Sequence, residues 1–199
     1  MRHFRKSSYT QKEFFNGKHR FEHWYRDNSV YFITSRTRAG FPAFQDASAR
    51  ALFWDRFHHY TKLHGFVPWV TSLLNNHYHT LGYLREGEQL GEMMRKLHGS
   101  VAWLVMKDIG VRHVPFWRGK GNKDYFDGCI RDVLQARRAY RYTLMQAVRA
   151  RLVTDWREYH DTRVNVEVER AIGRAVELDA FLEDVPYARY ERHKQRHRD

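Results

Sequence analysis

Cysteine is nearly absent from the sequence, because Cys129 is the single one among 199 residues. One thiol can form neither a disulfide framework nor a thiolate zinc cluster, so the chain fits a reducing compartment. No stretch approaches the roughly 18 consecutive apolar residues that a membrane-spanning helix needs. The N-terminus begins basic, but no apolar segment of a secretory signal follows it. From these absences we expect a cytoplasmic protein without a membrane partner.

Acidic residues are scarce relative to basic ones: 23 Asp and Glu stand against 35 Lys and Arg, a formal net charge of +12. This excess favours a polyanionic partner, nucleic acid first and an anionic membrane surface second. A basic but otherwise ordinary soluble protein is a further interpretation. A membrane-surface role would need a basic amphipathic helix with a broad apolar face, and the acidic Glu177, Glu183 and Asp184 do not fit one.

The order of the expected elements predicts an α+β fold. Periodicity and turn residues indicate strands over 30–35, 67–73, 77–84, 114–117 and 125–130, and helices over 46–64, 88–109, 132–153 and about 164–182. A turn at 119–122 separates the two short strands. Two or three helices packed on one face of a mainly antiparallel sheet make a ferredoxin-like sandwich with a helical, basic C-terminal extension. We expect an irregular basic arm over 1–28, one domain over 29–156 and a charged extension over 157–199.

His77 and His79 are the first candidate for a chemical site. Side chains alternate along a strand, so the two imidazoles share one face and Tyr78 lies on the other. Two imidazoles on one face can bind a cation and leave room for a third ligand and a substrate oxygen. The chain has 13 histidines, so for the pair taken alone a chance His-x-His is the favoured interpretation.

The helix expected over 132–153 carries the second candidate, Tyr142. On a wheel of about 100° per residue, its apolar stripe consists of Val133, Ala136, Tyr140, Leu144 and Ala147. Tyr142 lies on the opposite face with Gln135, Arg138, Gln146 and Arg149, so the core does not require it. Two guanidiniums there can hold phosphate oxygens, and a phenol activated by positive charge can attack a phosphodiester. An exposed tyrosine without a role is the alternative.

Two segments resemble a known family. The segment 74–81 (Leu-Asn-Asn-His-Tyr-His-Thr-Leu) is similar to the Pro-Asn-His-hydrophobic-His segment of HUH single-strand transposases. The segment 142–153 resembles the Tyr-Ile-x-x-Asn-Pro-Val-Arg-Ala-Gly-Leu-Val signature of REP-associated tyrosine transposases. Lesser similarities lie at 93–98, 116–118 and 130–131, so the resemblance runs from about Tyr31 to Trp156 in the family's order. Asn75, Gln146-Ala147 and Arg151 depart from the family's proline, Asn-Pro and glycine.

The resemblance implies a metal-dependent endonuclease and strand transferase over 29–156. His77 and His79 would bind Mg²⁺ or Mn²⁺ with Gln146 as third ligand, and Tyr142 would form a 5′-phosphotyrosine link to single-stranded DNA. The family's substrates are palindromes folded into hairpins, which implies a nucleoid-associated protein. The expected DNA-binding residues are Arg36, Arg38, Arg118, Lys120, Arg138 and Arg149. Trp24 and Tyr25 can stack on unpaired bases, but packing in the core is the favoured interpretation for each.

Several alternatives stay open. The chain can be a domesticated, non-catalytic nucleic-acid-binding protein on the same scaffold, which binds DNA in a salt-dependent way without a covalent adduct. It can also be a histidine-based metal hydrolase in which water, not Tyr142, attacks. Both a monomer and a homodimer fit the resemblance.

Overall fold

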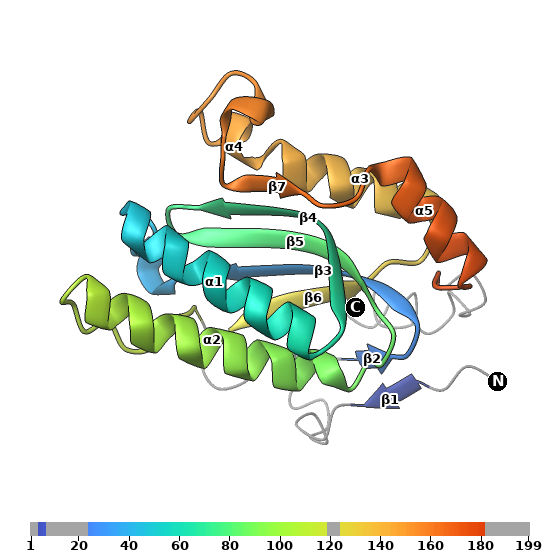
Figure 1. The fold of residues 1–199 in the computed structure, drawn as a ribbon, viewed down its shortest axis with the longest axis horizontal. Helices are drawn as coiled ribbons and strands as arrows, with labels where there is room; N and C mark the ends of the chain where they lie inside the picture. Colours follow the sequence, from blue (N-terminus) through green and yellow to red (C-terminus); the bar gives the residue numbers. More distant parts are fainter. Residues whose placement is uncertain (1–3, 7–23, 119–123, 182–199) are drawn as a thin grey trace, which may run out of the picture.

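The central part of the fold is a βαββαβ unit. The computed structural model describes residues 4–6, 24–118 and 124–181 (Figure 1). The unit consists of β3 (Ser29–Arg36), α1 (Ala47–Leu63), β4 (Phe66–Leu74), β5 (His77–Leu84), α2 (Gln89–Asp108) and β6 (Tyr125–Cys129). With β7 (Thr162–Val164) the strands form a five-stranded antiparallel sheet in the order β6-β3-β5-β4-β7. This order is that of a ferredoxin-like sandwich, so the predicted α+β fold class is confirmed.

The sheet is covered by helices on both faces. On one face Tyr31, Ile33 and Tyr78 belong to the core beneath α1 and α2. On the other, Val30 and Leu81 belong to the core beneath α3 (Val133–Leu144) and α5 (Val168–Glu177). Figure 1 shows the two pairs of helices on opposite sides of the sheet. Packing on one face alone was expected, because periodicity reveals that a helix has a buried stripe but not which side of a sheet receives it.

The two ends of the described chain add structure to this unit. β1 (Phe4–Lys6) pairs with β2 (Trp24–Arg26) inside the arm that was expected to be irregular. The segment expected as a charged extension contributes β7 and α5, after the short η3 (Trp156–Glu158). The helix expected from about 164 starts later, at Val168, where the Glu167 side chain accepts from the N–H of Glu169 as an N-cap. No helix of the described residues is long and apolar enough to cross a membrane.

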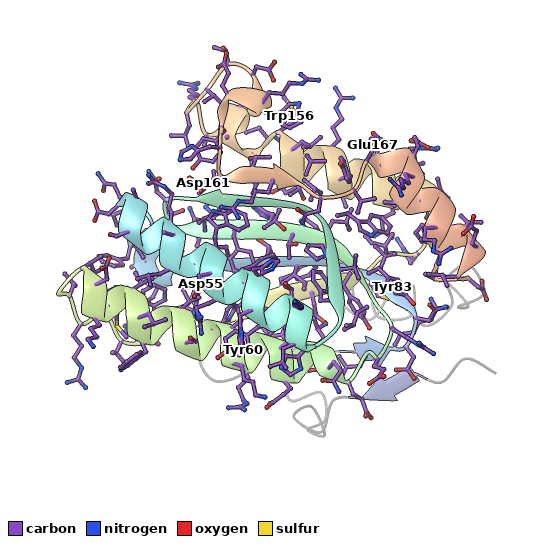
Figure 2. The ribbon with its side chains drawn as sticks, in the orientation of Figure 1. Asp55, Tyr60, Tyr83, Trp156, Asp161 and Glu167 are labelled. Carbon is purple, nitrogen blue, oxygen red and sulfur yellow. The ribbon has the colours of Figure 1, made fainter. Side chains whose placement is uncertain are left out.

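Asp161 anchors the C-terminal segment to α1. Its side chain, 4% exposed, accepts a hydrogen bond from the indole N–H of Trp54 at 2.7 Å and lies 3.0 Å from Nε of Arg50. Its carbonyl oxygen accepts from the N–H of Leu73 in β4 at 2.9 Å. Figure 2 shows Asp161 at the end of the sheet beside α1. Through its side chain and its carbonyl oxygen, Asp161 therefore links α1 and β4 to the start of β7.

The long helix expected over 132–153 is interrupted. α3 ends at Leu144, and after Met145 a short helix, α4 (Gln146–Arg149), follows. The side-chain amide of Gln146 donates to the carbonyl oxygen of Tyr142 at 2.9 Å, the acceptor that its backbone N–H uses in an uninterrupted helix. Arg151 then has a φ of 58°, the left-handed conformation that favours glycine. Arg151 thus keeps the backbone turn at the position where the family signature has glycine.

The edge of the sheet next to β3 also differs from the prediction. Val114–Trp117 is not a strand, because Pro115 has no N–H to donate and only Trp117 forms a bridge, with Thr37. The N–H of Arg118 donates to the carbonyl oxygen of Arg36. This short segment therefore runs along β3 in line with β6, and the two do not form a hairpin. The turn expected at 119–122 lies outside the described residues.

Candidate active site

His77 and His79 lie on the sheet face that α3 covers. They are alternate residues of β5, and their ring centroids are 5.1 Å apart with the planes at 86°. Nδ1 of His77 lies 2.7 Å from the side-chain oxygen of Asn76. The amide nitrogen of Asn76 in turn donates to the carbonyl oxygen of Gly40 at 3.1 Å. The strand and the Asn76 bridge therefore orient the two imidazoles, as the alternation predicts.

Both imidazoles are neutral near pH 7. Burial lowers the pKa of His77 to about 4, with a further decrease from the charge of Arg36, whereas a hydrogen bond with the Gln146 side chain raises it. Burial lowers the pKa of His79 to about 3, and His77 adds to the decrease. Neutral imidazole is the form that coordinates a metal ion.

An unpaired nitrogen of His79 indicates that a cation fits beside the two imidazoles. Its Nδ1 is buried and has no hydrogen-bond partner among the described residues. A buried polar atom without a partner is costly, and a bound cation would satisfy it. In the described part of the chain no three His, Cys, Asp or Glu side chains cluster to hold a metal. A cation here would therefore take two imidazoles and an amide or water oxygen, a mixed set of nitrogen and oxygen donors.

Tyr142, on α3, packs against this pair of histidines. Its ring meets the ring of His79 edge to face with centroids 5.2 Å apart, and meets Phe32 of β3 at 5.9 Å. Phe32 in turn stacks on His79 at 5.8 Å. The guanidinium of Arg149 lies 5.1 Å from the Tyr142 centroid, a cation–π arrangement. The tyrosine is 40% exposed, so the structure gives it a defined position that still faces solvent.

Gln146 joins Tyr142 and His77, although it is not on an exposed face. The wheel placed it beside Tyr142, but it is buried, with 6% exposed. Its amide nitrogen donates to the carbonyl oxygen of Tyr142, and its side chain raises the pKa of His77 through a hydrogen bond. The break between α3 and α4 produces this inward turn. Tyr142, His77, His79 and Gln146 are thus brought together.

The structure brings some of the predicted DNA-binding arginines to this site. Arg36 is exposed and pairs across the sheet with His77. Arg149 packs on Tyr142, and exposed Arg138 lies one turn before Tyr142 on α3. The exposed Arg118 follows the bridge at Trp117, next to Arg36.

Other predicted contacts lie elsewhere. Arg38, in η2 (Arg38–Gly40), donates from its guanidinium to the carbonyl oxygen of Val114 at 2.9 Å, so part of its hydrogen-bonding capacity is used within the protein. Lys120 and the side chain of Trp24 lie outside the described residues. Tyr25 is 7% exposed and belongs to the core beneath α1 and α2, so of the two fates considered for it the structure shows core packing and not stacking on bases. Burial of its large apolar ring is the stronger effect.

Sequence reasoning missed Phe32, which contacts both His79 and Tyr142. Its position in the strand over 30–35 predicts that it shares a face with Thr34, but this does not show which strand lies beside it. The pairing of β3 with β5 sets Phe32 opposite Leu81 and beside His79. Strand order is not readable from periodicity.

Comparisons with known proteins support the fold. No family model and no curated protein matches the chain. Among solved structures, a REP-associated tyrosine transposase bound to a REP hairpin superposes with a TM-score of 0.62 at 14% identity, over 78% of this chain and 88% of that chain. This chain shares its fold. A candidate transposase from Deinococcus radiodurans R1 gives a TM-score of 0.43 at 13% identity, over 54% of this chain and 83% of that chain, too low to add support.

Proposed function

We propose that this protein is a metal-dependent transposase of the HUH tyrosine type, which nicks and rejoins single-stranded DNA at hairpin-forming palindromes. The observation that carries the proposal is the solvent-facing Tyr142 placed edge to face on His79, 5.2 Å between centroids. A phenol held beside two neutral imidazoles and an arginine is an arrangement suited to attack on a phosphodiester. The fold shared with a hairpin-bound tyrosine transposase adds independent support.

His77, His79 and Gln146 would hold Mg²⁺ or Mn²⁺. When bound, the cation would polarise the scissile phosphate as a Lewis acid. The two histidines need no deprotonation for this at neutral pH, because burial already lowers both pKa values.

The chain's own residues would carry the strand transfer. The Tyr142 oxygen would attack phosphorus as its proton passes to water, forming a phosphotyrosine bond to the 5′ end of the downstream strand. The bond from phosphorus to the 3′ oxygen would break, and that oxygen would take up a proton and leave as a 3′-hydroxyl. Arg149 and Arg36 would bind the non-bridging oxygens. Attack by another 3′-hydroxyl on the phosphotyrosine would reverse the step and rejoin DNA.

Labelled hairpins test this proposal. Stem-loops built on palindromes of the source genome, with single-stranded flanks, are incubated with Mn²⁺ or with chelator and separated on a denaturing protein gel. A 5′-phosphotyrosine predicts that 3′-labelled DNA stays on the protein, whereas 5′-labelled DNA appears as a shorter free strand. Binding without an adduct would instead favour a non-catalytic DNA-binding protein. Cleavage without an adduct would favour a hydrolase in which water attacks.

A further inference from the structure

Asn76, the residue before the first histidine, is held in one orientation by the loop that follows β3. Its backbone oxygen accepts from the N–H of Thr37 at 2.8 Å. Its side-chain nitrogen donates to the carbonyl oxygen of Gly40 at 3.1 Å. Gly40 and Ala39 have φ values of 70° and 54°, a left-handed conformation that few residues adopt. The backbone and the side chain of Asn76 are thus both bound to one tightly turned loop.

The turn between β4 and β5 does not by itself require an asparagine at this position. Two-residue turns between antiparallel strands favour asparagine where φ is positive. Neither Asn75 nor Asn76 is among the described residues with a positive φ, so other residues could form this turn. The specific contribution of Asn76 is its side-chain amide, which bonds to Gly40 on one side and to His77 on the other.

The hydrogen bond to Gly40 determines which side of the amide faces His77. A carbonyl oxygen can only accept, so the amide nitrogen of Asn76 lies beside Gly40 and the amide oxygen lies 2.7 Å from Nδ1 of His77. The amide oxygen also can only accept, so Nδ1 carries a hydrogen. The ring is neutral near pH 7, because burial lowers its pKa to about 4, and a neutral imidazole has one N–H. Nε2 of His77 is therefore the nitrogen that keeps its lone pair.

We propose that Asn76 is a positioning residue that fixes the hydrogen of His77 on Nδ1, so that Nε2 is the atom that coordinates a cation. The coordinating role of Nε2 rests on the proposed function, whereas the position of the hydrogen is a property of the metal-free protein. Histidines that bind metals commonly donate from their second nitrogen to a fixed acceptor, and loss of that acceptor lowers metal affinity by about 10- to 100-fold. Asn76 supplies this acceptor, and Gly40 holds it in place.

Two substitutions of Asn76 separate this role from a structural role in the turn. Asn76→Leu has a similar shape but offers Nδ1 no acceptor. Asn76→Asp keeps an acceptor for Nδ1 and loses the donor to Gly40. Asn75→Leu, the same change at the neighbouring turn residue, is the matched control, because the backbone oxygen of Asn75 accepts from the N–H of Phe44 and is kept.

The test has one measurement without metal and one with Mn²⁺. The chemical shifts of the ring nitrogens, measured by NMR on the full chain near neutral pH with chelator, show which nitrogen of His77 carries the hydrogen. A His77→Gln variant assigns the signal. Calorimetric titration with Mn²⁺ gives the metal affinity, and thermal unfolding confirms that the variants fold. The shifts of the unaltered protein need no variant, so they test the first step even where Asn76→Leu does not fold.

We expect the hydrogen on Nδ1 of His77 in the unaltered protein, in Asn75→Leu and in Asn76→Asp. In Asn76→Leu it should shift toward Nε2, and Mn²⁺ should bind about 10- to 100-fold more weakly. Asn76→Asp should restore most of this affinity, whereas a purely structural role predicts equal losses in both variants, since both lose the bond to Gly40.

Three results overturn the role of Asn76: a hydrogen on Nε2 in the unaltered protein, an Mn²⁺ affinity that Asn76→Leu leaves unchanged, or equal losses in Asn76→Leu and Asn76→Asp. An unaltered protein that carries the hydrogen on Nδ1 but binds no Mn²⁺ refutes the metal site of the proposed function, and with it the coordinating role of Nε2.

Discussion

Tyr142 and His79 meet edge to face with their ring centroids 5.2 Å apart. Tyr142 belongs to α3 and His79 to β5, so the contact joins the helical layer to the sheet. Gln146 links Tyr142 to the histidine pair, because its amide donates to the Tyr142 carbonyl oxygen and its side chain raises the pKa of His77 through a hydrogen bond. The end of α3 and the start of β5 are thus tied together by one buried amide.

Metal binding should depend on the histidine pair. His79→Ala removes one imidazole ligand, and loss of a ligand or of its support typically lowers metal affinity at least about 10-fold. Calorimetric titration with Mn²⁺ measures the change. His58→Ala, an exposed histidine of α1, is the matched control and should bind Mn²⁺ as the unaltered protein does. Unchanged affinity in His79→Ala would exclude this ligand set.

Arg36 should contact a DNA phosphate. Its substitution by alanine should weaken binding of single-stranded DNA and reduce the slope of log K against log salt by about 0.7, since one phosphate contact releases about that many counterions. Arg56→Ala, on α1 beside Asp55, is the control and should leave the slope unchanged. Equal slopes for both variants would show that Arg36 is not a phosphate ligand.

Stability of the metal-free protein should fall between about pH 6.5 and 4. The folded pKa values of His77 and His79 lie below the ordinary 6.5, so in this window the unfolded chain binds more protons and acid favours unfolding. Buried His79 should contribute up to about 1.4 kcal/mol per pH unit, and half-buried His77 less because of solvent screening.

Urea unfolding with chelator across this pH range checks the expectation. The double variant His77→Ala, His79→Ala should show a flatter dependence than the unaltered protein. Ordinary carboxylates titrate near pH 4, so the slopes are compared above about pH 5, where carboxylates contribute little. An equal slope in the double variant would assign the pH dependence to other groups.

Asp161 should be important for stability. Asp161→Ala removes the acceptor of the Trp54 N–H and the carboxylate partner of the Arg50 guanidinium, which should lower the free energy of unfolding by about 2–3 kcal/mol. Asp55→Ala is the control: Asp55 is a 61% exposed partner of Arg56, and surface pairs contribute about 0–1 kcal/mol. Similar losses for the two variants would contradict the anchoring role.

Much of the sheet was predictable, because its strands are rich in β-branched and aromatic residues and its turns have glycine or asparagine. β5 and α2 lie close to the ranges expected for them, and the shared face of His77 and His79 follows directly from alternation. β7 was not predictable. Its three residues are too short for a pattern, and they become a strand only because β4 offers them an edge.

The sequence predicted which residues make up the candidate site better than it predicted how they are arranged. The wheel found Tyr142 exposed, but it extended one regular helix through Gln146, whereas the break at Met145 turns Gln146 inward. Phe32 became relevant only through strand order. Pairing of β3 with both β5 and β6 is a tertiary property that local residue patterns do not specify.

The central claim is that Tyr142 is the nucleophile, and one matched pair of variants tests it most directly. Tyr142→Phe and Tyr140→Phe each remove one hydroxyl from α3, and that of Tyr140 donates to the carbonyl oxygen of Val166. Both are incubated with Mn²⁺ and a 3′-labelled stem-loop, then separated on a denaturing gel. We expect the covalent adduct to vanish in Tyr142→Phe and to persist in Tyr140→Phe. An adduct that survives in Tyr142→Phe would contradict the account.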